Sequence, residues 1–212
     1  MMNVSFLTVL MLCIAGGLAQ TTNPDWADEK KFGPFQDAWA SLDQDESGVY
    51  YLVRTTYPDD EGSWGKNFEC VAVTETKKEQ EKKTVTSRFV FKNDSSAGSQ
   101  DIFEVERKVQ AVSKYGYNQP NAIKYLVGGE GKDFTDPLVF SDAHHCDLFH
   151  VPYVNGEMGG YELWVNADDV EAIPSYCLFM FNFFSRKHSD VYVKYEKTKC
   201  QDVTEKIKKL KK

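Results

Sequence analysis

The stretch Val139–Val165, VFSDAHHCDLFHVPYVNGEMGGYELWV, has the pattern of a β-hairpin. Two strand-like runs flank Asn155–Gly160, where asparagine and glycine favour a tight connection. Side chains two positions apart on a strand point to the same face, so Glu162 shares a face with Trp164, and Asp147 also lies in an aromatic row. A single acid on a strand usually faces solvent. Two acids in matching rows instead predict one wall of a polar pocket.

Six further strand-like runs lead up to this hairpin, with turn residues and no helical pattern between them. Strands at such short and even spacing are typical of an antiparallel sandwich or barrel. With the two hairpin strands the count is eight, so we predict an all-β fold. The six runs are Gly48–Tyr57, Asn67–Thr74, Lys83–Lys92, Asp101–Lys114, Ala122–Val127 and Phe134–Phe140.

Helical spacing is confined to the two ends of the chain. Apolar residues between Phe35 and Leu42 predict one short amphipathic helix before the first strand. Pro174 is placed to begin a second helix, whose apolar stripe predicts that it packs on the sheet as core. Asp190–Glu196 is a candidate for one more strand. The stripe of the second helix comprises Cys177, Met180, Phe181 and Phe184, widened by Phe179 and Phe183.

The chain of 212 residues has the length of one domain with a sizeable core. Residues 1–19 predict a secretory signal peptide, because a short apolar run ends in small residues at Ala19, although lysine and arginine are missing before it. We expect the barrel domain over residues 20–200 and a lysine-rich tail over residues 201–212, which is either a frayed helix or disordered. No later run is long and apolar enough for a transmembrane helix, so we expect a soluble, secreted protein.

The cysteine count agrees with secretion. Cys13 would leave with the signal peptide, and an even number of cysteines would remain in an oxidising compartment. Four cysteines allow three pairings, between which the spacing does not choose. Asn93, in Asn-Asp-Ser, is a predicted glycosylation acceptor in a surface loop. The remaining cysteines are Cys70, Cys146, Cys177 and Cys200.

Charge is distributed unevenly along the chain. Lys197–Lys212 carries +5, which leaves −12 for the rest of a chain whose net charge is −7. An acidic body disfavours nucleic acid and favours a cationic partner. The alternative is that surface acids only keep the protein in solution.

Alternation on other strands places Tyr57, Tyr125 and Asp136 in further apolar rows. If eight strands close, these rows point into a lumen large enough for one small ligand. A buried carboxylate is costly unless it is paired, so several acids around one cavity imply a cation that binds and leaves. Charge-assisted hydrogen bonds of roughly 1.5–3 kcal/mol each, with cation–π contacts of roughly 0.5–2 kcal/mol, are sufficient for nanomolar affinity.

Enzymatic alternatives have weak support. His144, His145 and His150 lie near Cys146, but adjacent residues on a strand point apart and the cysteine is expected to be oxidised, so we predict no metal site. Neither a nucleophile elbow nor a phosphate loop occurs. We therefore predict no catalytic residues and no cofactor.

Short motifs spread over nearly the whole mature chain add a family resemblance. They are Asp25-Trp26-Ala27-Asp28-Glu29, Gln36-Asp37-Ala38-Trp39, Tyr50-Tyr51, Trp64-Gly65, Tyr115-Gly116-Tyr117-Asn118, Phe134-Thr135-Asp136, Cys146-Asp147, Val151-Pro152 and Gly160-Tyr161-Glu162-Leu163-Trp164. None is specific alone, but together they resemble the tick salivary histamine-binding proteins, a divergent branch of the lipocalins. The stretch Asp59–Gly65 is most similar to members that take serotonin as well as histamine.

The resemblance implies an eight-stranded lipocalin-type barrel with a short N-terminal helix and a C-terminal helix packed outside it. It also implies disulfides Cys70–Cys200 and Cys146–Cys177, and up to two sites for biogenic amines. The tighter site would use Tyr57, Asp60, Phe134, Glu162 and Trp164. The second would use Ser41, Asp45, Trp64, Tyr125, Asp136 and Asp147.

The implied function is that of a secreted carrier, not an enzyme. It would sequester host histamine or serotonin in tick saliva and suppress inflammation at the feeding site. We also expect a monomer with no nucleic-acid or membrane partner.

Arg107 departs from the family pattern, which has a glutamate at this position of the tighter site. Its alternation row faces inward, where a fixed cation repels an amine and is expected to pair with Asp60 or Glu162. One alternative function is therefore a lipocalin that binds an anionic lipid mediator, a leukotriene or fatty acid, through Arg107. Another is an extracellular module whose lysine-rich tail binds heparin-like polyanions.

Overall fold

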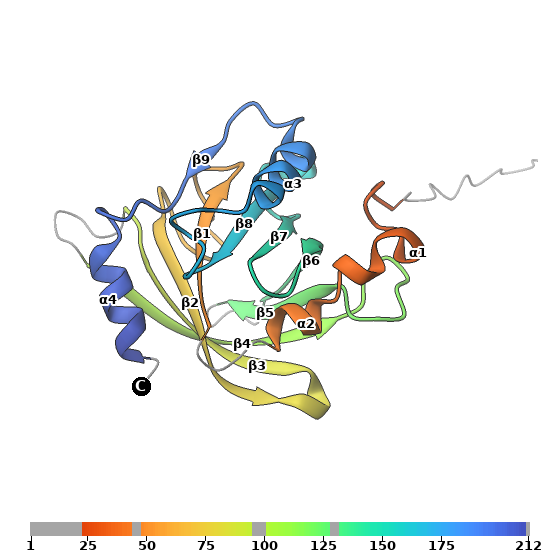
Figure 1. The fold of residues 1–212 in the computed structure, drawn as a ribbon, viewed down its shortest axis with the longest axis horizontal. Helices are drawn as coiled ribbons and strands as arrows, with labels where there is room; N and C mark the ends of the chain where they lie inside the picture. Colours follow the sequence, from red (N-terminus) through yellow and green to blue (C-terminus); the bar gives the residue numbers. More distant parts are fainter. Residues whose placement is uncertain (1–22, 44–47, 95–100, 128–131, 211–212) are drawn as a thin grey trace, which may run out of the picture.

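A computed structural model of the protein describes residues 23–43, 48–94, 101–127 and 132–210. Within these residues eight antiparallel strands close into a barrel in the order β2-β3-β4-β5-β6-β7-β8-β1, and β1 closes the ring by pairing with β2 (Figure 1). The predicted barrel is thus confirmed. The strands are β1 Val49–Thr55, β2 Glu69–Glu79, β3 Thr84–Lys92, β4 Phe103–Val112, β5 Ala122–Val127, β6 Lys132–Ser141, β7 Cys146–Val151 and β8 Gly160–Asn166.

The predicted hairpin is formed by β7 and β8. In its register Asp147 lies opposite Trp164 and Phe149 opposite Glu162, so both acids are on the inner face. The connection needs glycine at Gly159, where φ is +66° and an added Cβ would lie 2.5 Å from His150 Nε2. Only glycine adopts this backbone without strain at such close approach.

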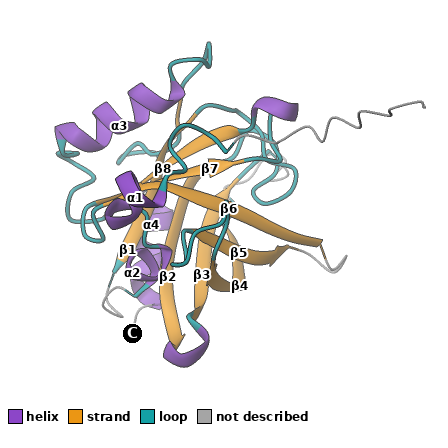
Figure 2. Cartoon of the chain, turned by 90° about the vertical axis from the view of Figure 1, so that its right-hand side faces the viewer, coloured by secondary structure: helices purple, strands orange, loops and turns teal. Residues whose placement is uncertain are grey.

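Two apolar layers follow from the alternation of side chains along the strands. Tyr50 and Leu52 of β1 belong to the core inside the barrel, whereas Tyr51 and Val53 pack in a second core on its outer face. Figure 2 shows α3 lying outside the strands. Helix α3 therefore takes no part in lining the lumen, whereas Ser41 of the N-terminal segment does.

The helix predicted between Phe35 and Leu42 is confined to α2 Ala38–Leu42, and two further short elements, α1 Glu29–Phe32 and η1 Gly33–Phe35, precede it. The start of α2 has a local cause, because the Asp37 carboxylate accepts hydrogen bonds from the backbone N–H of Trp39 at 2.9 Å and of Ala40 at 3.1 Å. This is an N-cap, which begins a new helix after Asp37.

The aromatic helix α3, Ser175–Ser185, buries Cys177 and Phe181 as predicted. The buried stripe is narrower than predicted, since Phe179 and Phe183 are 62% and 47% exposed. A single helix face covers only part of the circumference, and these two rings stack on each other outside it.

The lysine-rich tail forms an ordered helix, α4, Gln201–Leu210, so the helical alternative is confirmed, and the expected fraying or disorder is wrong for these residues. Val203 and Ile207 lie one turn apart on the face packed against β2, and both are fully buried. The predicted strand in Asp190–Glu196 is reduced to β9, Tyr192–Val193, which pairs with β1.

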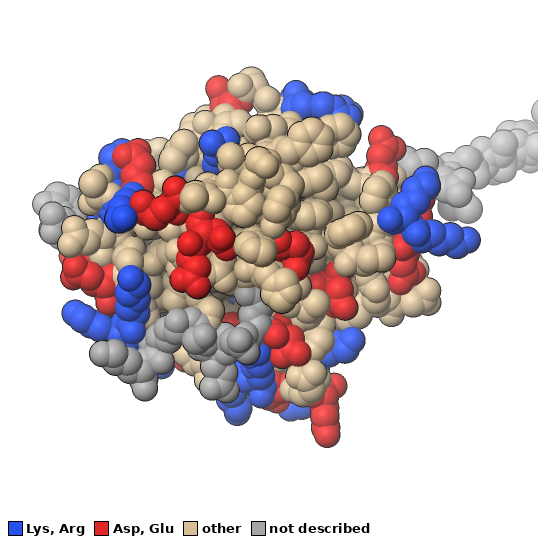
Figure 3. Space-filling model, in the orientation of Figure 1, with Lys and Arg blue, Asp and Glu red and all other residues tan. Residues whose placement is uncertain are grey.

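Charge on the face shown in Figure 3 is interspersed, with acidic and basic side chains alternating around its edge. In the part of the chain described, no helix has both the length and the apolar character needed to cross a membrane.

Candidate ligand-binding cavity

The barrel encloses a cavity of about 100 Å³. One water molecule needs roughly 10–15 Å³ by this measure, so the space suits a small organic molecule. Most of the predicted site residues meet here. Those that line the cavity are Ser41, Trp64, Arg107, Tyr125, Asp136, Asp147, Glu162 and Trp164.

The other predicted site residues lie beside the lining or outside the described residues. The Tyr57 hydroxyl donates a hydrogen bond to the Glu162 carboxylate. Asp60 interacts electrostatically with Glu162 and Arg107. The Phe134 ring stacks with that of Tyr125, with 6.1 Å between the ring centroids. Asp45 lies in residues 44–47, outside the described part of the chain.

Glu162 of β8 is a buried acid of the cavity, 5% exposed, with three side-chain hydrogen-bond donors. Its carboxylate accepts hydrogen bonds from the indole Nε1 of Trp164 at 2.9 Å and of Trp64 at 3.3 Å, and from the Tyr57 hydroxyl. Burial raises its pKa. All three donors are neutral, so a charge on Glu162 has no direct counter-ion among them.

Asp60 and Asp136 complete a group of three acids with Glu162. Burial and the charge of Glu162 raise the pKa of Asp60 to about 7. Burial, with the charges of Glu162 and Asp60, also raises the pKa of Asp136 well above its usual range. We call these residues the Glu162 group. The resemblance placed Asp136 in the other site, with Asp147.

Tyr153 is a residue beside the cavity that the sequence analysis missed. Its hydroxyl lies 2.5 Å from that of Tyr125, which donates to Asp136 Oδ2 at 2.5 Å. A signal was present, because Tyr153 continues the alternation row of Asp147 beyond Pro152. The row predicted from the sequence stops at Val151.

Asp147 of β7 is 6% exposed and lies near Ser41 and Ser141, whose hydroxyls donate to it. Burial raises its pKa to about 7. Its Oδ1 atom has no hydrogen-bond partner among the described residues. The Asp147 carboxylate therefore faces the cavity with one oxygen still able to accept a hydrogen bond.

Glu75 is the second residue that was missed. It lines the cavity, and burial raises its pKa to about 8, opposed by the charge of Lys78. The predicted strand ended at Thr74, whereas β2 continues to Glu79. The predicted boundary lies five residues too early, directly before Glu75, and thus concealed an acid.

Arg107 points inward, as its alternation row predicts, and is 8% exposed. The expected ion pair with Asp60 or Glu162 is wrong: within the described residues no carboxylate lies within 4.0 Å of the guanidinium. It donates to the Ser63 carbonyl at 3.0 Å and lies 4.7 Å from the ring centroid of Trp64. A planar, weakly hydrated guanidinium stacks well on an indole, and the acids have neutral donors instead.

Lys194 fixes the loop that carries Asp60 and Trp64. Its ammonium donates to the backbone carbonyls of Pro58 at 2.8 Å and Phe68 at 2.9 Å, which are the two ends of this loop. Burial lowers its pKa to about 8. The chain is tied again nearby by the disulfide Cys70–Cys200.

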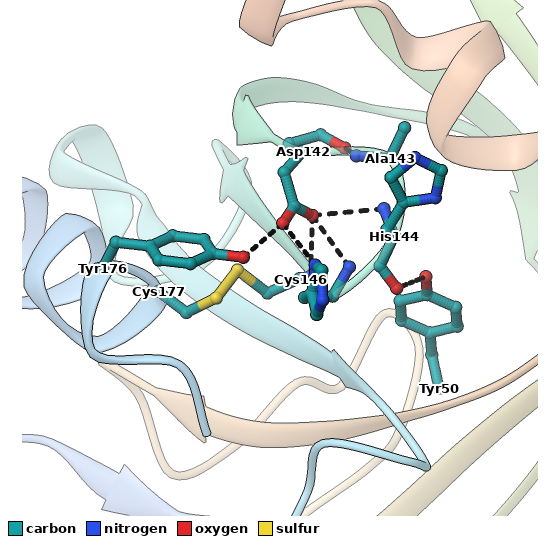
Figure 4. Close-up of a disulfide and its surroundings, with 9 residues drawn as sticks. Tyr50, Asp142, Ala143, His144, Cys146, Tyr176 and Cys177 are labelled. Carbon is teal, nitrogen blue, oxygen red and sulfur yellow. Dashed lines mark hydrogen bonds and ion pairs between the residues drawn. A yellow bond between two sulfur atoms is a disulfide. The ribbon is translucent and has the colours of Figure 1, made fainter. Parts of the chain in front are cut away.

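The second disulfide, Cys146–Cys177, joins β7 to α3 beside Asp142 (Figure 4). The Asp142 carboxylate accepts from the backbone N–H of His145 at 2.8 Å and from the Tyr176 hydroxyl at 2.5 Å. The adjacent histidines thus belong to a structural turn. Among the described residues no cluster of three or more His, Cys, Asp or Glu has the arrangement of a metal site.

Asn93 stays a predicted glycosylation site. Its side-chain amide donates to the Trp64 carbonyl at 2.6 Å and is half-buried. Ser95 of the acceptor motif is outside the described residues.

Replacing Asp147 by asparagine should flatten the pH dependence of stability. The pKa of Asp147 is about 7 in the folded protein against an ordinary value of 3.8. The neutral carboxyl therefore contributes stability that is complete below about pH 4 and is lost as the pH rises to about 7. Urea unfolding should show the parent losing roughly 2 kcal/mol more than Asp147→Asn between about pH 5 and pH 7. Asp168→Asn, at an exposed position, is the control and should follow the parent.

The closed barrel and its buried, acidic and aromatic cavity define a lipocalin-like protein that binds a small ligand. A family model described as "Tick histamine binding protein" matches residues 26–202. The chain therefore belongs to the tick histamine-binding protein family. This is a family of binding proteins, not of enzymes.

Two relatives from Rhipicephalus appendiculatus are similar over most of their length. A male-specific histamine-binding salivary protein is 38% identical over 185 residues, covering 85% of this chain and 90% of the relative. A female-specific histamine-binding protein 1 is 34% identical over 182 residues, covering 86% and 92%.

Solved structures support the same fold. A crystal structure of a serotonin complex of the protein AM182 has a TM-score of 0.54 and 22% identity, covering 84% of this chain and 97% of that one. H1 crustacyanin from the lobster Homarus americanus has a TM-score of 0.52 and 11% identity, covering 88% and 99%. At such identities the likeness concerns the fold alone.

Proposed function

We propose that this protein is a secreted carrier that binds and sequesters a biogenic amine, histamine or serotonin. The observation that carries the proposal is the set of buried acids in or beside one aromatic cavity, namely Asp136, Asp147 and Glu162 in its lining and Asp60 next to it. Their pKa values are raised because burial disfavours the charged form. A bound ammonium ion offsets the free-energy cost of the buried carboxylate charges, and the aromatic rings of the cavity add cation–π attraction.

The relatives support this ligand class and a salivary role. Both are named for histamine binding, and one is named a salivary protein. With the predicted signal peptide, this supports secretion into saliva and removal of a host mediator of inflammation at the feeding site.

The proposal predicts that amine binding releases protons and strengthens as the pH rises. A bound ammonium lowers the pKa of the acids near it, so carboxyls that are neutral at pH 6 must ionise on binding. Serotonin affinity should rise between about pH 5.5 and pH 7.5 by up to roughly tenfold per pH unit for each proton released. Serotonin is suited to this test because its ammonium stays charged throughout.

Isothermal titration calorimetry in buffers of different ionisation enthalpy measures both quantities. Histamine, serotonin and leukotriene B4 should be titrated in parallel. Heat from the amines with proton release supports the proposal. An absence of amine binding at every pH would contradict it.

The second candidate is an anionic lipid mediator, and Arg107 is the observation that favours it. In the described residues its guanidinium has no carboxylate within 4.0 Å, and its hydrogen bond goes to the neutral Ser63 carbonyl. A carboxylate ligand would supply the missing anion. Binding of leukotriene B4 in place of both amines would favour this function.

A further inference from the structure

Glu75 and Asp147 form a second acidic pair in the cavity, distinct from the Glu162 group. Glu75 comes from β2 and Asp147 from β7, and both line the cavity. The charge of Asp147 acts on Glu75 and helps to raise its pKa. Strands from different parts of the chain thus bring two carboxyls close enough to interact.

An unsatisfied oxygen on each residue indicates that the pair has capacity for a ligand. Asp147 Oδ1 and Glu75 Oε2 are buried and have no hydrogen-bond partner among the described residues. Asp147 is more than nine-tenths buried and faces the cavity. Buried polar atoms without partners are uncommon because each costs free energy, so a donor in the cavity is expected to satisfy them.

Lys78 and Arg107, two cationic residues of the described chain near this pair, both have other partners. The Lys78 ammonium acts on Glu75, but it is 3.2 Å from Asp43 Oδ1 in an ion pair. Arg107 begins in the same lateral row as Glu75, since Glu75 pairs with Ser87 and Ser87 with Arg107. Its guanidinium nevertheless contacts Ser63 and Trp64, at the Glu162 group.

Arg107 therefore makes the two acidic groups unequal. Its positive charge acts on Asp60 and partly neutralises the Glu162 group. An ammonium entering that group meets repulsion from a guanidinium that stays charged at physiological pH. At the Glu75–Asp147 pair it meets two acids, with Lys78 already paired.

We infer that Glu75, together with Asp147, binds the primary ammonium of the ligand, whose ring lies along Trp164 and whose polar ring substituent points to the Glu162 group. This orientation rests on the proposed function and assigns a role to Glu75. Trp164 links the two groups, because it lies opposite Asp147 in the register and donates to Glu162. Two residues along a strand span about 7 Å, a spacing that suits an aromatic monoamine.

The test compares serotonin with tryptamine, which lacks only the ring hydroxyl. Glu75→Gln should weaken both amines by the same factor, about 10- to 100-fold, because each loses one charge-assisted bond to its ammonium. Glu162→Gln should weaken serotonin more than tryptamine, since only serotonin has the hydroxyl. Calorimetry at pH 7.5 gives the affinities, and thermal melts verify that each variant is folded. Glu81→Gln, an exposed control, should leave both affinities unchanged.

The reverse pattern would overturn the inference. If Glu162→Gln weakened both amines equally while the effect of Glu75→Gln depended on the hydroxyl, the ammonium would be at the Glu162 group. A Glu75→Gln variant that bound both amines as tightly as the parent would exclude Glu75 while leaving the proposed function standing. If the parent protein bound neither amine, both this inference and the proposed function would be rejected.

Discussion

Replacing Cys70 and Cys200 by alanine is expected to lower the free energy of unfolding by about 4–5 kcal/mol. The disulfide closes a loop with a sequence separation of 130 residues, so its removal returns much conformational entropy to the unfolded chain. It also releases α4, which covers β2 with Val203 and Ile207. Urea unfolding followed by tryptophan fluorescence measures the loss.

The other disulfide is the matched control. Cys146–Cys177 has a separation of 31 residues, and loop entropy predicts a loss about 1 kcal/mol smaller when both cysteines become alanine. A larger loss from the shorter loop would show that packing of α3 on the hairpin outweighs the entropy of the unfolded chain.

Arg107→Glu is expected to convert a protein that binds one amine into one that binds two. Arg107 acts on Asp60 and Glu162, and a unit charge about 7 Å away contributes roughly 2 kcal/mol at an effective dielectric constant of about 20. Exchanging repulsion for attraction therefore changes amine affinity at the Glu162 group by roughly 4 kcal/mol, close to a thousandfold. Calorimetry with histamine should show a stoichiometry of two, the new site being the tighter.

Two variants separate the charge of Arg107 from its position. Arg107→Gln removes the charge and should give an intermediate gain. Arg88→Glu changes a half-exposed arginine on the neighbouring strand β3, paired on the surface with Glu104 and Glu106, and should leave amine binding unchanged. A stoichiometry of two in the parent would mean that the guanidinium moves aside for an amine. The ammonium would then have no electrostatic reason to prefer the Glu75–Asp147 pair over the Glu162 group.

Predictions from the sequence alone succeeded where they depended only on local backbone geometry, namely the two-residue period of a strand and the positions of turns. The period of two along a strand places Asp147, Glu162 and Arg107 on the inner face whatever the rest of the chain does. Turn residues at short, even spacing likewise predicted eight strands, which the structure has, and the family resemblance selected the barrel over the sandwich. Patterns local to the strands and turns were sufficient for all of these features except the choice of the barrel.

Which inward side chains meet was decided only by the tertiary structure. Glu75 and Asp147 come from β2 and β7, and Asp136 joins Asp60 and Glu162 instead of Asp147, because strand tilt and stagger set the depth of each residue in the barrel. Arg107 stacks on Trp64 because the loop tied by Lys194 brings the indole to it. The sequence pattern by itself thus determined the strands and the direction of their acids. Closure of the barrel and the docking of its loops decided how those acids divide into two groups, since depth and contact depend on segments far apart in the chain.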